Sequence, residues 1–252
     1  MPAVLQRYFL EIAFKGTEFH GWQIQPEVVT VQSTLEAALQ QVLGVKTAVM
    51  GCGRTDTGVH AMQFFLHFEH ESDEQLGEKL LRSLNGVLHQ DIAVKRIIPV
   101  AIDAHARFDA KERAYQYFVH FGKDPFLKGR SLMLFNDLDM PRMNKAAAHL
   151  LGKQDFSSFC RTGSDVKTHL CDVRKAEWTE QDGQFIFTIS ADRFLRNMVR
   201  AVVGTLIDVG SGRMSIDEFQ EVIQAKDRTK ASKSALACGL YLTKVEYPYI
   251  NE

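Results

Sequence analysis

Two similar series of apolar patterns follow one another along the chain. In the first, alternating or β-branched runs predict strands, and apolar residues at helical spacing predict helices. The expected order is strand 7–14, helix 31–43, strand 46–52, strand 62–70, helix 72–88 and strand 91–100. This β-α-β-β-α-β order is the split pattern of ferredoxin-like and RRM-like domains. The first helix should end at Gly44, and Ser33 and Glu36 have the spacing of a capping box near its start.

The second series repeats this rhythm without a recognisable repeat in the letters. It predicts strand 114–121, helix 140–152, a hairpin over 176–191, helices 194–210 and 215–225, and strand 240–248. Asp182-Gly183 supplies the two-residue turn of the hairpin. We therefore expect an α+β fold of two tandem units with mainly antiparallel sheets and a central cleft. A polar segment at 103–112 suggests one domain over 1–106 and a second over 107–252.

Composition changes this picture little. The 252 residues carry 30 Lys and Arg against 31 Asp and Glu, a formal net charge of -1. A polyanionic partner would therefore have to bind a local basic patch. The four cysteines form no C-x-x-C pair, and no run approaches the roughly 18 apolar residues of a membrane span. We expect a soluble, cytoplasmic protein with reduced thiols and no signal peptide.

The stretch GCGRTDTGVH, residues 51–60, concentrates three glycines around Arg54 and Asp56. Glycines allow tight turns and the close approach of a ligand to the main chain. On an extended segment Arg54 and Asp56 would share a face, where the guanidinium could keep the carboxylate ionised as a nucleophile or base. A glycine-rich turn with a structural ion pair has the same letters, so the pattern alone leaves both interpretations open.

Three histidines near this stretch, His60, His67 and His70, raise the possibility of a metal site. His67 and His70 would face opposite ways on one strand. Surface or core-edge positions are therefore the favoured interpretation, and no metal is expected.

Tyr115 and Tyr117 share one face of a predicted strand, beside Arg113. Such a face can pack on a core, or it can provide an aromatic platform for an unstacked base. In the predicted helix 194–210, Arg196 and Arg200 are one turn apart and Arg193 extends their stripe. If Arg200 is buried it needs an anionic partner, for which Asp56 is the natural candidate.

A run of cations near the C-terminus falls in a predicted loop. It comprises Lys226, Arg228, Lys230 and Lys233. Such runs are usually solvated, but this one could also contact phosphates.

Taken in order, the motifs resemble those of the bacterial tRNA pseudouridine synthase A family, which isomerises uridines 38, 39 and 40 of the tRNA anticodon stem-loop. The matching stretches are GTEFHGWQIQ, TVQSTLEAAL, GRTDTGVHA, LNGVL, HARFDAKERAYQYFV, DFSSFC, FLRNMVRAVVGTL and GLYLTKVEYP. They extend almost from end to end of the chain.

This resemblance implies that Asp56 is the catalytic aspartate, Tyr115 the active-site tyrosine and Arg200 the partner of the aspartate. It implies that Arg54 helps to shape the pocket and extrude the target base. It further implies two domains with a cleft, a homodimer that binds tRNA, and no cofactor. The chain departs from the family pattern at Thr57, at Arg193 and in the segment Ser234–Ala237. The rival hypotheses are a tRNA-binding or chaperone protein without catalysis, and a glycosidase, which would generally need two carboxylates.

Overall fold

The computed structural model describes residues 4–72, 76–164 and 166–250, which divide into two compact units. One unit contains residues 1–111 together with 242–252, and the other contains residues 112–241. The sequence had suggested a boundary between 106 and 107, with the C-terminal residues in the second half. In the structure the chain from Leu242 onward belongs to the first unit instead.

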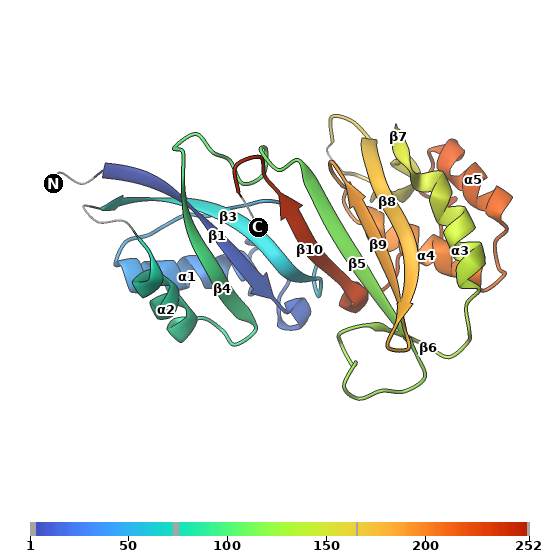
Figure 1. Ribbon diagram of the computed structural model, residues 1–252, viewed down its shortest axis with the longest axis horizontal. Helices are drawn as coiled ribbons and strands as arrows, with labels where there is room; N and C mark the ends of the chain where they lie inside the picture. Colours follow the sequence, from blue (N-terminus) through green and yellow to red (C-terminus); the bar gives the residue numbers. More distant parts are fainter. Residues whose placement is uncertain (1–3, 73–75, 165, 251–252) are drawn as a thin grey trace. The chain divides into compact units, whose positions relative to one another are not determined.

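The first unit is built on long antiparallel strands, shown with its helices in Figure 1. Strand β1 (Val4–Phe14) pairs on one side with β3 (His60–Ser72) and on the other with β4 (Ile92–Val100). The two-residue strand β2 (Met50–Gly51) pairs with β3. The spatial order β4-β1-β3-β2, all antiparallel, agrees with the split pattern expected from the sequence.

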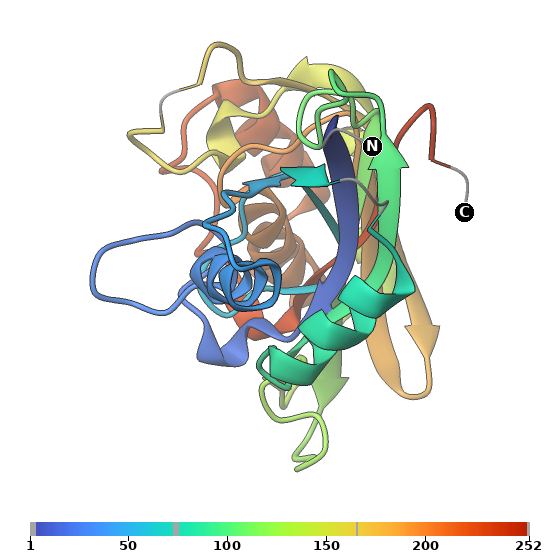
Figure 2. The same ribbon diagram turned by 90° about the vertical axis from the view of Figure 1, so that its left-hand side faces the viewer.

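Two helices complete the first unit, α1 (Val31–Leu43) and α2 (Glu78–Val87). Helix α1 ends at Gly44, as expected, because that glycine adopts a φ of 75°. Its capping box differs from the expected one: Thr30 is the N-cap, and it exchanges hydrogen bonds with Ser33. A short 3-10 turn, η1 (Gly16–Glu18), follows β1, and the segment between η1 and α1 extends outward in Figure 2.

The second unit is also mainly antiparallel. Strand β5 (Glu112–Phe121) pairs with β9 (Gln184–Ala191), which pairs with β8 (Leu170–Gln181), and β7 (Gly152–Asp155) forms the edge. The turn between β8 and β9 has positive φ at Asp182 and Gly183, as the hairpin signal predicted. A short strand, β6 (Leu132–Leu134), runs parallel to β5 and was not predicted, and neither was β7.

Three helices cover one face of this second sheet (Figures 1 and 2). They are α3 (Met140–Ala147), α4 (Met198–Gly210) and α5 (Ile216–Ala225). Helix α4 is buried along almost its whole length because α3 and α5 both contact it. Strand β10 (Leu240–Glu246) ends the described elements and is divided between the two units. In the part of the chain that the structure describes, no helix is both long enough and apolar enough to cross a membrane.

Candidate active site

The loop of residues 52–59, which carries Arg54 and Asp56, connects β2 to β3 in the first unit. The Cys52 amide donates to the Phe65 carbonyl at 2.7 Å, which fixes the start of the loop to β3. At its other end the Val59 amide donates to the Asp56 carbonyl at 3.1 Å, closing a turn in which Gly58 has a φ of 79°. The backbone at Asp56 is therefore fixed within a turn.

A second segment, residues 16–22, packs directly against this loop. The Trp22 amide donates to the Thr55 carbonyl and the Gly58 amide to the Phe19 carbonyl, each at 3.3 Å. Gly16 leaves no room for a side chain, since a Cβ there would overlap the Val59 carbonyl oxygen. The residues GTEFHGW thus hold the aspartate loop from the side, which gives a physical reason for glycines at both ends of that stretch.

The Trp22 side chain packs next to the start of the loop. Its ring lies 4.2 Å from that of Phe64, centroid to centroid, and it also covers Gly51, where a Cβ would come within 2.6 Å of the indole. Both Trp22 and Phe64 are buried. The apolar pattern of the sequence gives Trp22 no role, although its position after a glycine in a short loop was a usable signal.

Asp56 is half-buried and Arg54 is exposed. Among the described residues these two side chains form no ion pair with each other. Asp56 has other interactions, whereas the guanidinium of Arg54 has none with the described residues. Arg54 is consequently available to an external group.

Tyr115 lies on β5 in the second unit, opposite Ile189 of β9. The edge of one ring meets the face of the other between Tyr115 and Phe194, with centroids 5.0 Å apart and planes at 88°. Aromatic pairs favour this geometry, which fixes the orientation of the tyrosine ring. Phe194, which precedes α4, makes this contact, and the sequence pattern did not indicate it.

Tyr117 shares the strand but is completely buried. Its hydroxyl donates to the Leu236 carbonyl at 2.7 Å, and burial raises the pKa of this phenol well above its usual range. Of the two tyrosines, Tyr117 has the core role and only Tyr115 is partly exposed.

Arg200 lies in the first turn of α4 and is half-buried. Its Nε donates to the Ala235 carbonyl at 2.8 Å, while the Ala235 amide donates back to the Arg200 carbonyl at 2.9 Å. The segment that contains Ala235 approaches α4 so closely that a Cβ at Gly204 would overlap the Lys233 carbonyl oxygen. These contacts leave little freedom at the base of the Arg200 side chain.

The expected stripe of arginines along this helix was wrong. Helix α4 begins at Met198, and Asn197 before it adopts a left-handed conformation with φ of 65°. Arg193 and Arg196 therefore precede the helix, and only Arg200 belongs to it. Asparagine is one of the few residues that tolerate the αL conformation. The spacing of apolar residues does not reveal, however, that Asn197 adopts it.

The cation-rich loop after α5 is partly structural. Arg228 donates to the carbonyls of Ala231 and Ser232 and to the Ser234 hydroxyl, each at 3.1 Å. Lys226 lies 3.8 Å from the Asp155 carboxylate. Lys230 and Lys233 remain exposed.

Two histidines of the first unit, His60 and His67, accept hydrogen bonds from the main chain and so contribute to the fold. Nδ1 of His60 accepts from the Gly16 amide at 2.9 Å, and Nδ1 of His67 accepts from the Ala106 amide at 3.1 Å. Burial, with smaller contributions from His105 and Arg7, lowers the pKa of His67 to about 4. Among the described residues no cluster of three or more His, Cys, Asp or Glu has a geometry suited to a metal ion.

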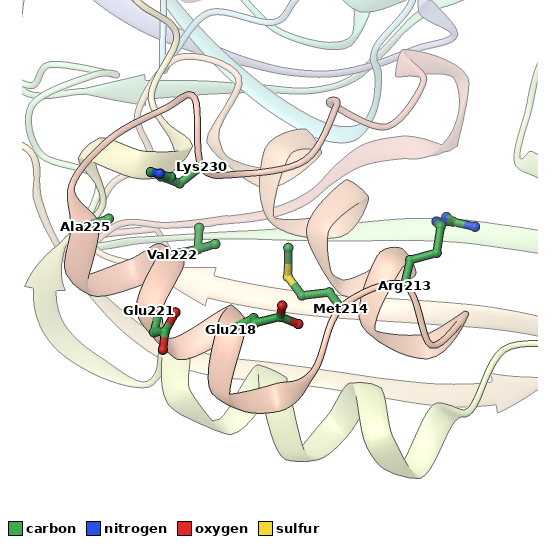
Figure 3. Close-up of a pocket in the computed structure, with 7 residues that line it drawn as sticks. All are labelled: Arg213, Met214, Glu218, Glu221, Val222, Ala225 and Lys230. Carbon is green, nitrogen blue, oxygen red and sulfur yellow. The ribbon is translucent and has the colours of Figure 1, made fainter.

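A pocket of about 320 Å³ lies beside α5 in the second unit (Figure 3). It is lined by Arg213, Met214, Glu218, Glu221, Val222, Ala225 and Lys230. Two of its charged groups are already engaged, since Glu218 caps α5 and Arg213 pairs with Asp208. Of the residues singled out from the sequence, only Lys230 of the cation run lines this pocket. Arg54, Asp56, Tyr115 and Arg200 do not, so the pocket does not define the site.

The candidate residues thus fall into two groups, each ordered within its own unit. Arg54 and Asp56 lie on the loop held by residues 16–22, while Tyr115 and Arg200 lie on β5 and α4. The protein therefore has an α+β fold in which a fixed loop carries Asp56 in one unit, while Tyr115 and Arg200 lie in the other.

Comparisons with known proteins agree on one family. The sequence model of a family described as tRNA pseudouridine synthase matches residues 12–109 and 146–248. A tRNA pseudouridine synthase A from Bacteroides fragilis is 46% identical over 245 residues, covering 97% of each chain. That of Bacteroides thetaiotaomicron is 47% identical over 247 residues, covering 97% of this chain and 91% of the relative. That of Neisseria meningitidis serogroup C is 40% identical over 250 residues, covering 96% and 92%.

The chain belongs to the tRNA pseudouridine synthase family. It is an isomerase of the class that converts uridine to pseudouridine in tRNA. The family expected from the ordered motifs is confirmed, and so is the α+β fold with mainly antiparallel sheets.

Proposed function

We propose that this enzyme isomerises uridines 38, 39 and 40 of the tRNA anticodon stem-loop and that Asp56 is its catalytic residue. The observation that carries the proposal is the support of the aspartate loop, with Thr55 and Gly58 hydrogen-bonded to residues 16–22. A carboxylate that must act on a ribose needs a backbone fixed beforehand, because a small misplacement costs much of the rate.

The reaction breaks the bond between ribose C1′ and base N1. The detached uracil turns and rejoins C1′ through C5, C5 loses its proton, and N1 gains one. Substrate and product are isomers, so the proposal includes no cofactor. Asp56 acts on the ribose as a nucleophile, or as a base during glycosidic cleavage.

The target base must first leave its stack, at a cost of a few kcal/mol. In the proposal Arg54, which is exposed, contacts the RNA and helps to extrude the base. Tyr115 stacks on the extruded uracil in the orientation set by Phe194. Arg200 is the cation that keeps Asp56 ionised and oriented.

The proposal also includes a cytoplasmic homodimer in which both subunits contact tRNA. Size-exclusion chromatography with light scattering tests the oligomeric state directly. A monomer that retains full activity would contradict this part of the proposal alone.

The test of the catalytic assignment is tritium release from C5-labelled uridine in tRNA. Asp56→Asn keeps the size of the side chain but removes its charge, and should abolish release while retaining tRNA binding. Near-normal release by Asp56→Asn and by Asp56→Ala would disprove the role of Asp56. The sites follow from mapping pseudouridine in tRNA of cells that lack the enzyme, before and after wild type is restored.

The alternative is a tRNA-binding or chaperone protein without catalysis. It predicts that wild type and Asp56→Asn bind tRNA equally and that neither forms pseudouridine. Family membership and the supported aspartate loop favour the enzyme.

A further inference from the structure

Two arginines distant in sequence come together in the second unit. The backbone amide of Arg161 donates to the carbonyl of Arg196 at 3.0 Å, although 35 residues separate them. Both side chains are exposed. We propose that Arg161 and Arg196 form a phosphate-binding site for the tRNA backbone, separate from the residues assigned to the target uridine. This inference rests on the proposed function, because it takes tRNA as the ligand.

The guanidinium groups of Arg161 and Arg196 differ from those of most other arginines in the described chain in having no protein partner among the described residues. Five arginines pair with carboxylates: Arg7, Arg82, Arg96, Arg174 and Arg213. Others, such as Arg142 and Arg228, donate to main-chain carbonyls. Neither kind of partner contacts the guanidinium of Arg161 or Arg196 among residues 4–72, 76–164 and 166–250. In a chain of net charge -1, two adjacent arginines without a carboxylate are a local excess of positive charge.

The backbone around both arginines is fixed. The Arg161 carbonyl accepts from the Ser164 hydroxyl at 2.7 Å. On the other side Asn197, next to Arg196, donates from its side-chain amide to the Ser234 hydroxyl at 2.6 Å. Ser234 is held in turn by Arg228. The backbone next to Arg196 is thus attached to the segment of Ser234 and Ala235, which also contacts Arg200.

The chemistry suits a phosphodiester. Guanidinium groups offer several N–H donors in a planar fork that matches phosphate oxygens, and they remain charged at any physiological pH. Contacts to phosphates give affinity and orientation without reading sequence. A site of this kind would place the anticodon arm while leaving the choice of uridine to the residues around the target base.

The test compares two double variants with the same change in charge. Arg161→Gln/Arg196→Gln removes the proposed site, and Arg82→Gln/Arg213→Gln removes two exposed arginines that pair with carboxylates. Filter binding of unmodified tRNA at several salt concentrations gives Kd and its salt dependence. We expect Kd to rise roughly tenfold in the first variant, and the salt slope to fall by about 1.5 to 2. The second variant should stay close to wild type.

Turnover supplies a second measure. The first variant should show a raised KM with kcat within about twofold of wild type, because uniform binding is lost. Arg161→Lys/Arg196→Lys retains both charges and should recover most of the affinity. Equal Kd and salt slope in the two Gln variants would overturn the proposal.

Measuring both tRNA binding and turnover also distinguishes a failure of the proposed function from a failure of the arginine-pair proposal. If wild type binds tRNA but forms no pseudouridine, the proposed function fails while the binding comparison still judges the arginine pair. If wild type does not bind tRNA, both are refuted.

Discussion

Gly21 lies against the carbonyl oxygen of Thr55, so close that any side chain at residue 21 would overlap that oxygen. Gly21 also has a φ of 82°, a conformation that L residues rarely adopt. Thr55, the residue before Asp56, is therefore packed against residue 21, where only glycine fits without displacing the Thr55 carbonyl.

Gly21→Ala should destabilise the protein by about 2 kcal/mol and reduce pseudouridine formation at least tenfold, because strain and overlap both act on the loop. The matched control is Gly44→Ala, which has a φ of 75° but open space around it. That variant should lose about 1 kcal/mol through strain alone and retain its activity. Urea unfolding and tritium release measure both effects. Equal activity of the two variants would show that the approach to Thr55 is unimportant for catalysis.

Phe194→Leu should remove the edge-to-face contact that orients Tyr115. We expect kcat/KM to fall about tenfold, with a loss of stability near 1 kcal/mol. Phe185→Leu is the control, because Phe185 makes a similar contact with Phe121, with centroids 4.9 Å apart and planes at 80°. Similar kinetics for both variants would mean that the ring of Tyr115 needs no support from Phe194.

Gly204 and Gly86 are helical glycines with opposite surroundings. A Cβ at Gly204 would overlap the Lys233 carbonyl, whereas Gly86 has open space. Gly204→Ala should cost about 2 to 3 kcal/mol by overpacking and lower activity through Arg200. Gly86→Ala should instead stabilise α2 by about 0.5 to 1 kcal/mol, because alanine has the higher helix propensity. Thermal unfolding measures both, and a Gly204→Ala protein as stable as wild type would refute the close approach.

His67 should make stability depend on pH. Burial lowers its pKa to about 4 from 6.5, so between these values the unfolded chain binds more protons than the folded one. This contribution is complete above pH 6.5 and is lost as pH falls through about 4. Allowing for partial exposure to solvent, it amounts to about 1 to 2 kcal/mol. His67→Asn, whose side-chain oxygen can still accept from Ala106, should flatten the unfolding free energy between pH 4 and 6.5. An unchanged slope in that variant would exclude His67 as its source.

The sequence predicted the strands and helices that have regular periodicity, and the hairpin at Asp182-Gly183. It misplaced the start of α4, because the αL conformation of Asn197 depends on tertiary contacts such as its bond to Ser234. It missed β6 and β7, which are too short to show a period. At the candidate site it indicated the charged groups and the tyrosine, whose roles stay predictions. It could not identify Phe194 or Trp22, whose roles depend on rings brought together by the fold.

The division of strand β10 between the two units affects the order in which the units can fold during synthesis. Residues 242–250 belong to the same compact unit as residues 4–111, so that unit contains residues made before the second unit and residues made after it. N-terminal domains generally fold first during synthesis. Here the first unit cannot be completed until residues 242–250 have been made, and the second unit is the first whose residues have all been made.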